Sequence, residues 1–297
     1  MRRQLVVTAA LVLAACLAWS QQPAPAQPAP APAAQQEVQK QPQVKSQPEG
    51  QAIVAMFQAA DPDARIKAAQ DLLVKFADTE FKAIALQMIA ASYQQKNDFE
   101  NMVVWAERAL EADPKAYHPM LMLATGIAQR TREFDLDREE KLVRAEKYAH
   151  GAMDILKVLP KPRPDITDEQ WDGAKRDFAS QAHEALALAG LARKKYDAAI
   201  TEFKLAVETA ANPDPATMVR LGAIYNLAGK HDDAIAVLDK VMAGAEVHPT
   251  IKQFAQAERA RAFQAKGGAA KPTAPAPSAQ AAPAAPPAAP QPEAKKP

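Results

Sequence analysis

The sequence contains very little cysteine and almost no net charge, and each shortage excludes a class of protein. Cys16 is the only cysteine among 297 residues, so no internal disulfide can form and stability must come from packing. Lys and Arg number 36 against 35 Asp and Glu, which leaves a formal net charge of +1. Because no basic stripe interleaved with aromatic residues is present either, we expect no nucleic-acid partner.

Large apolar side chains are lacking at both ends of the chain. Residues 21–48 and 269–297 are almost entirely Ala, Pro, Gln and Lys, which cannot repay the entropy of ordering the backbone. We therefore predict a disordered linker at 21–48 and a disordered tail at 269–297. The remaining residues, 49–268, are enough for one elongated domain with a buried core.

The N-terminus has the pattern of a secretion signal. Arg2 and Arg3 precede an apolar run from Leu5 to Trp19 that is too short for a membrane-spanning helix. We predict a signal peptide over residues 1–20 and hence an exported protein, periplasmic or associated with the outer membrane of a bacterium. Cleavage after Ser20 would release a mature chain that begins at Gln21.

A second cleavage site competes with the first. Leu13-Ala14-Ala15-Cys16 resembles the lipobox of bacterial lipoproteins. In that family the cysteine thiol receives a lipid and becomes the first mature residue, so the resemblance implies lipidation of Cys16. That lipid would be the protein's only attachment to a membrane.

Between the two ends the pattern is helical throughout. Apolar residues recur at spacings of three and four, with no sustained alternation of period two, so we expect an all-α domain. Helix starts are indicated by capping residues followed by proline, at Asp61-Pro62, Asp113-Pro114 and Asp214-Pro215. Capping boxes are predicted for Ser46 with Glu49 and for Thr167 with Gln170, the second of which opens a long helix from Asp168 to about Lys194.

The spacing of small and large residues repeats with a period near 34. One copy reads Met218-x-x-Leu221-Gly222-x-x-Tyr225, and Ala234 and Leu238 follow it. Further copies begin at Leu86, Met120 and His183, and the copy at Met120 is interrupted by extra residues around 132–137. This pattern is similar to the tetratricopeptide repeat. The resemblance implies an α-solenoid of antiparallel helix pairs wound as a right-handed superhelix.

Small residues at fixed places in each repeat let neighbouring helices approach closely, while larger residues fill the gaps. We expect this repeat packing to involve Ala90, Tyr93, Ala124, Ala187, Ala199, Phe203, Leu221, Gly222, Tyr225 and Ala234.

The sequence contains no complete motif for catalysis or metal binding. His183-Glu184 begins like the H-E-x-x-H zinc helix, but Ala187 stands where the second histidine is needed. The other histidines lack metal-ligand spacing, and no nucleophile motif stands out. We therefore expect no metal, no cofactor and no enzymatic activity.

In tetratricopeptide proteins the first helices of successive repeats line a concave groove that holds a peptide or a partner's helix. Carried onto this chain, the resemblance gives the groove candidates Gln87, Ala91, Gln94, Leu121, Thr125, Glu184, Leu188, Leu191, Val219, Ala223 and Asn226. Apart from Arg220 and Asn226, the chain lacks the side chains that grip a partner's C-terminal carboxylate. A mostly neutral groove suits an amphipathic helix or a backbone-contacted peptide. Alternatively, Leu188 and Leu191 pack against neighbouring repeats.

Three functions remain open. The first is a non-catalytic protein–protein interaction scaffold of the bacterial cell envelope, with an unidentified protein or peptide partner. The second is an envelope-assembly lipoprotein of an outer-membrane or secretion machine, which requires a retained Cys16. The third, an enzyme of unrecognised type, would need a convergent set of polar residues that the sequence does not offer.

Overall fold

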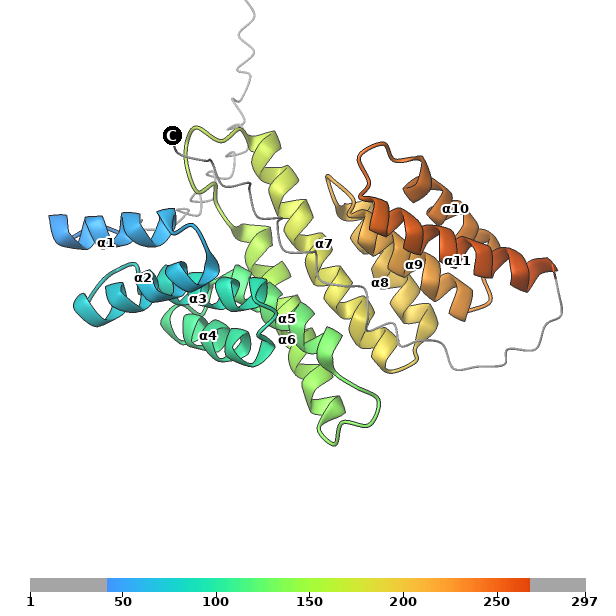
Figure 1. Cartoon of the computed structure of the whole chain (residues 1–297), viewed down its shortest axis with the longest axis horizontal. Helices are drawn as coiled ribbons and strands as arrows, with labels where there is room; N and C mark the ends of the chain where they lie inside the picture. Colours follow the sequence, from blue (N-terminus) through green and yellow to red (C-terminus); the bar gives the residue numbers. More distant parts are fainter. Residues whose placement is uncertain (1–41, 268–297) are drawn as a thin grey trace, which may run out of the picture. The chain divides into compact units, whose positions relative to one another are not determined.

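The computed structural model describes residues 42–267, which contain eleven α-helices and no strand (Figure 1). The helices are α1 (Gln47–Gln58), α2 (Pro62–Lys75), α3 (Lys82–Gln95), α4 (Phe99–Ala112), α5 (Tyr117–Arg130), α6 (Arg138–Val158), α7 (Asp168–Ala192), α8 (Tyr196–Thr209), α9 (Pro215–Leu227), α10 (His231–Ala243) and α11 (Pro249–Gly267). The predicted signal peptide, Cys16, most of the linker and the C-terminal tail lie outside the described residues.

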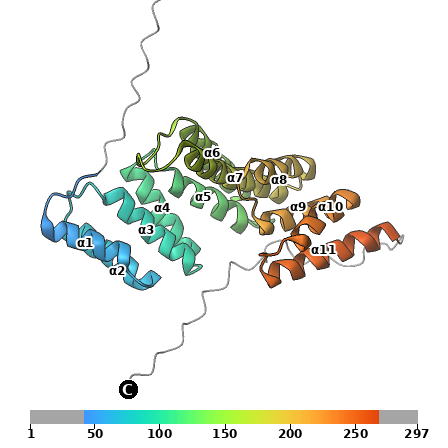
Figure 2. The same cartoon turned by 90° about the horizontal axis from the view of Figure 1, so that it is seen from above.

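The helices follow one another as antiparallel pairs, each packed on the next (Figure 2). α1 to α10 form five such pairs, and α11 closes the series by packing against both α9 and α10. Neighbours in the chain are therefore also neighbours in space, as the helical solenoid prediction requires. We call the odd-numbered members of the pairs the first helices and the even-numbered members the second helices.

The first helix begins where the predicted cap at Ser46 places it. α1 starts at Gln47, and the Ser46 hydroxyl caps it by accepting from the Glu49 backbone N–H at 3.3 Å. The Glu49 side chain is buried, and its carboxylate accepts from the Thr79 hydroxyl and from the Lys45 backbone N–H, both at 2.6 Å. In the predicted capping box the Glu49 carboxylate would accept from the Ser46 backbone N–H, but it accepts from the Lys45 backbone N–H.

One predicted helix start is wrong. Asp113-Pro114 does not open a helix, because the Ala116 N–H donates to the Asp113 carbonyl at 3.1 Å and closes a turn around Pro114. Proline favours the second position of such a turn, and α5 begins only at Tyr117. The box at Thr167 and Gln170 is confirmed, since each side chain accepts from the other's backbone N–H and α7 follows directly.

The buried apolar side chains of the described residues form three clusters. The largest runs from Ala90 of α3 to Ala262 of α11, the second joins α1, α2 and α3, and the third joins α5, α6 and α7. Of the residues predicted to pack the repeats, Ala90, Ala124, Ala187, Ala199, Phe203, Leu221, Gly222, Tyr225 and Ala234 are buried, and Tyr93 is half-buried.

Three of the turns from a first to a second helix share one geometry. Asn97, Lys194 and Gly229 each have a positive φ, of 57°, 60° and 72°. In each turn the next backbone N–H donates back to the carbonyl five residues earlier, as in Lys230 to Tyr225 at 2.8 Å. This is the Schellman ending of a helix, in which the left-handed residue reverses the chain direction. Glycine adopts that conformation freely, whereas asparagine and lysine adopt it at a cost.

The turn after α5 does not share this geometry. Thr131 stands 34 residues after Asn97, but its φ is −69° and its hydroxyl donates to the Ile127 carbonyl at 2.8 Å. A β-branched residue strongly disfavours the left-handed region, so the chain cannot reverse there. It continues instead through a loop at 131–137 before α6 begins at Arg138. The extra residues predicted around 132–137 lie in this loop.

Replacing Gly222 with leucine should destabilise the domain. A Cβ added at Gly222 would lie 2.6 Å from Cγ of Leu238, which is fully buried and cannot move aside. We expect the free energy of unfolding to fall by about 1–3 kcal/mol in urea titrations. Gly267→Ala is the control, because a Cβ at Gly267 meets nothing within 4 Å. Equal unfolding midpoints for Gly222→Leu and the native chain would contradict the proposed helix contact.

Replacing Lys194 with glycine should have the opposite effect. The substitution relieves a left-handed lysine, and the ion pair that it removes, with Glu133, is exposed and contributes little. We expect a gain of about 0.5–1 kcal/mol in the free energy of unfolding. Lys195→Gly is the matched control, because Lys195 has a φ of −84° and should gain nothing from glycine. If both variants changed stability equally, the Lys194 turn would not be strained.

Candidate functional site

The predicted groove residues lie on α3, α5, α7 and α9, but they differ in exposure. Gln94 is exposed, and Gln87, Ala91, Thr125, Glu184, Leu191, Val219 and Ala223 are half-buried. Leu121, Leu188 and Asn226 are buried. The structure therefore corrects the prediction for these last three residues, which pack inside the domain.

Each buried candidate has an identifiable neighbour. Leu121 belongs to the cluster that joins α5 to α6 and α7, and Leu188 belongs to the largest cluster, against which Leu191 also packs. The Asn226 amide Nδ2 donates to the Glu258 carbonyl at 2.9 Å and to its carboxylate at 3.1 Å. Asn226 thus holds α11 in place. The alternative interpretation of Leu188, packing within the repeats, is the one that the structure shows.

An ion pair occupies the candidate surface between α7 and α9. Glu184 lies 2.5 Å from Arg220 Nη1, and the Thr217 hydroxyl donates to Glu184 at 2.7 Å. The Asp214 carboxylate accepts from the Thr217 backbone N–H at 3.2 Å and also caps α9. Arg220 and Asn226, the two side chains suited to gripping a carboxylate, are therefore both engaged within the chain.

The first part of the predicted face stays open. Gln87, Ala91 and Gln94 follow one another at spacings of four and three along α3, so they share one side of the helix. Thr125 of α5 stands 34 residues after Ala91, at the same place in its repeat. Within the described chain the side chains of Gln87, Gln94 and Thr125 make no hydrogen bond. We call these four residues the α3–α5 face.

Three aromatic rings meet where α5 starts, an arrangement that the sequence did not predict. Tyr117 and His118 of α5 lie 5.1 Å and 4.9 Å from the ring of Phe178 on α7, measured between ring centroids. Burial lowers the pKa of His118 and raises the pKa of Tyr117 to about 12. Phe178 lies in the part of α7 that precedes the repeat motif, so the repeat register gave no sign of this contact.

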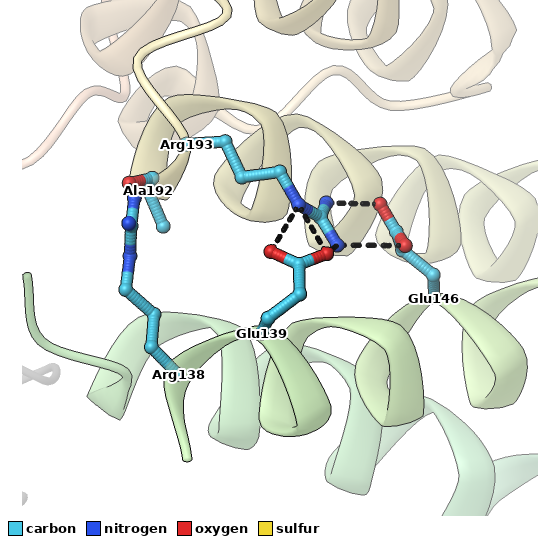
Figure 3. Close-up of polar contacts among 5 residues, drawn as sticks. All are labelled: Arg138, Glu139, Glu146, Ala192 and Arg193. Atoms are coloured by element: carbon cyan, nitrogen blue, oxygen red, sulfur yellow. Dashed lines mark hydrogen bonds and ion pairs between the residues drawn. The ribbon is translucent and has the colours of Figure 1, made fainter. Parts of the chain in front are cut away.

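A charged cluster fixes the turn after α7 (Figure 3). The guanidinium of Arg193 donates to both oxygens of Glu139 at 2.8–3.0 Å and to both oxygens of Glu146 at 2.5 Å and 3.1 Å. These bonds raise the pKa of Arg193 and lower the pKa of Glu139. Nearby, Arg138 donates to the Ala192 carbonyl. The cluster bridges α6 and α7, and among the described residues the buried Nε of Arg138 is left without a hydrogen-bond partner.

Residues 42–267 contain neither a metal-binding cluster nor a membrane-spanning helix. No group of three or more histidine, cysteine, aspartate or glutamate side chains there is arranged to hold a metal ion. None of the helices described combines the length and apolarity needed to cross a membrane.

Comparison with known proteins defines the repeat type. Residues 83–116, which span α3 and α4, match the tetratricopeptide repeat family model. They include Met102, which departs from the small residue usual at the start of a second helix and packs in the largest cluster.

A solved structure shares the fold over most of the chain. A thermophilic tetratricopeptide repeat protein of Thermus thermophilus is 14% identical, with a TM-score of 0.50, and the match covers 71% of this chain and 98% of that one. An assembly chaperone of RpL4 is 12% identical, with a TM-score of 0.40, covering 73% and 96%. No curated protein matches the sequence. At these identities the first likeness shows the helical solenoid fold alone.

The aromatic contact at α5 predicts an acid-sensitive domain. Burial lowers the pKa of His118 in the folded chain, so on acidification the unfolded chain, with a pKa of about 6.5, takes up the proton first. Stability is therefore present above that value and is lost as the pH falls through the folded pKa. His118→Phe should weaken this pH dependence of the urea midpoint, while His150→Gln, at an exposed site, should not. If the urea midpoint of His118→Phe varied with pH as it does in the native chain, His118 would not be the source of the acid sensitivity.

Proposed function

We propose that this protein is a non-catalytic protein–protein interaction scaffold that binds an uncharged segment of its partner on the α3–α5 face. Tetratricopeptide repeats commonly mediate contacts between proteins, which supports the general class. The observation that carries the specific proposal is the free hydrogen-bonding capacity of Gln87, Gln94 and Thr125 on that face.

The chemistry of the face limits what it can bind. Amide and hydroxyl side chains both donate and accept, so they can pair with the N–H and C=O groups of an extended peptide backbone. Ala91 between them lets that backbone approach closely. None of the four residues of this face is cationic, so the face does not suit a partner's C-terminal carboxylate. Arg220, on another part of the candidate surface, is paired with Glu184. We therefore propose an internal, neutral segment of the partner as the ligand.

The proposed place of action is the bacterial cell envelope. This part of the proposal is supported by sequence alone, through Arg2, Arg3, the apolar run that follows and the Leu13-Ala14-Ala15-Cys16 motif. A lipid on Cys16 would hold the helical domain near a membrane through the segment that precedes Gln47. Loss of the motif by cleavage would release the same domain into the periplasm.

Site-specific photocrosslinking tests the proposed face. A photoreactive amino acid at Gln87 or Gln94 should give the same crosslinked partner in the producing cell, identified by mass spectrometry. The same amino acid at Glu111, which is exposed on the second helix α4, should not capture it. Adding Ala91→Glu and Thr125→Glu should abolish the adduct from Gln94, because buried unpaired carboxylates oppose a neutral ligand.

Two outcomes would contradict the proposal. Adducts from Glu111 but not from Gln87 or Gln94 would place the partner on the second helices. Adducts that persist in the glutamate variant, with an unchanged melting temperature, would show that the face does not bind by backbone contact.

A further inference from the structure

The loop at 131–137 is braced by its own backbone and by the helix before it. The Arg132 N–H donates to the Asp135 carboxylate at 3.1 Å, and the Asp135 N–H donates to the Arg132 carbonyl at 3.3 Å. The Arg138 N–H then donates to the Asp135 carbonyl at 3.2 Å. With the Thr131 hydroxyl bonded to α5, the loop has a defined conformation.

The acidic side chains of the loop are also held by the domain. Lys141 of α6 lies 3.0 Å from Asp135 and 2.8 Å from Asp137, and Lys194 lies 2.5 Å from Glu133. These ion pairs fix the loop against α6 and the end of α7. Glu133 and Asp137 still keep about half of their side-chain surface exposed, at 51% and 53%.

The apolar side chains of the same loop are exposed to solvent. Phe134 is 91% exposed and Leu136 is 107% exposed, the two highest values among the large apolar residues described. A single exposed apolar residue needs no explanation. Two of them, one residue apart on a braced loop, form a preorganised anchor that loses little entropy when it binds.

A crevice of matching character lies between α8, α9 and α10. Its volume is about 380 Å³, and Met218, Leu221 and Val237 line its apolar floor. Its rim carries four charged side chains, Lys204, Glu208, Asp233 and Lys240. No salt bridge within the described residues joins any of these four to another side chain.

We propose that the loop of one copy of this chain docks into the crevice of a second copy, with Phe134 on the apolar floor. Glu133 and Asp137 flank the apolar anchor and match Lys204 and Lys240 on the rim. The exposed Arg132 matches Glu208 and Asp233. The occupant is a second copy because both halves of a complementary pair are present on one chain, while Phe134 stays exposed in the single copy.

This contact joins two different surfaces, and it is isologous where two copies exchange it reciprocally and heterologous where it runs one way. Two copies close into a dimer when each loop reaches the other's crevice, and otherwise they form longer assemblies. The buried area is small, and we therefore expect association in the micromolar to millimolar range of protein concentration. The contact does not involve the α3–α5 face, so it stands independently of the proposed function.

Sedimentation velocity of the full-length chain, purified from the producing cell, tests the inference. The native chain should show a mass that rises with concentration. Phe134→Ser with Leu136→Ser, and separately Lys204→Glu with Lys240→Glu, should both remain monomeric. Val74→Ser with Val158→Ser is the matched control, because each of these valines is 81% exposed and lies outside both loop and crevice. This control should associate like the native chain.

A mixing experiment decides between this contact and a general loss of solubility or folding. The loop variant keeps an intact crevice and the crevice variant keeps an intact loop, so an equimolar mixture should form a complex although neither variant associates alone. All variants should keep the native melting temperature. The proposal is overturned by a native chain that is monomeric throughout, by a mixture that stays monomeric, or by association that survives both double substitutions. Flotation of the native chain with phosphatidylcholine vesicles, lost in the loop variant, would assign the loop to a lipid surface and also overturn it.

Discussion

Close approach of helix backbones through alanine and glycine is the constraint on which the rest of the structure depends. Most fully buried residues are alanines, and Phe203 is the largest side chain with no exposure. An alanine removes little apolar area from water, so stability must be gathered from many tight contacts along the series of helices. A core of this kind tolerates added volume poorly where a fully buried side chain faces a glycine, as Leu238 faces Gly222.

A periodic set of ion pairs follows from the same packing. The second residue of a second helix pairs with a cation at the end of the next first helix, as in Asp63–Lys96, Asp197–Lys230 and Asp232–Lys266. Glu139–Arg193 is the same pair across the longer α7. The first three pairs are largely exposed and each contributes at most about 1 kcal/mol, whereas the Arg193 side chain of the fourth pair is only 12% exposed. They help to set the register between repeats, because each pair joins one repeat to the next at a fixed sequence separation.

The sequence predicted what depends on neighbours in the chain and missed what depends on neighbours in space. The small positions around Gly222 and the cap at Thr167 are local, and both were predicted correctly. The exposure of Leu121, Leu188 and Asn226 depends on how closely α5, α7, α9 and α11 approach one another, which a repeat motif does not specify. Pro114 is a local exception, because it lies in a turn and not at a helix start. The Glu49 carboxylate, predicted to accept from Ser46, accepts from Lys45 and from Thr79, which is 30 residues away.

The one irregular turn has effects beyond its own residues. Thr131 cannot take the left-handed conformation that reverses the chain at Asn97, Lys194 and Gly229, so the loop at 131–137 replaces a tight turn. Glu133 then stands 33 residues after Glu100, where the other junctions place a cation, and like charges cannot pair there. Glu133 pairs instead with Lys194, past the end of α7, and this pairing helps hold the loop that presents Phe134. Thr131 thus accounts for the loop that exposes Phe134, while the negative charge of Glu133 accounts for the missing ion pair between repeats.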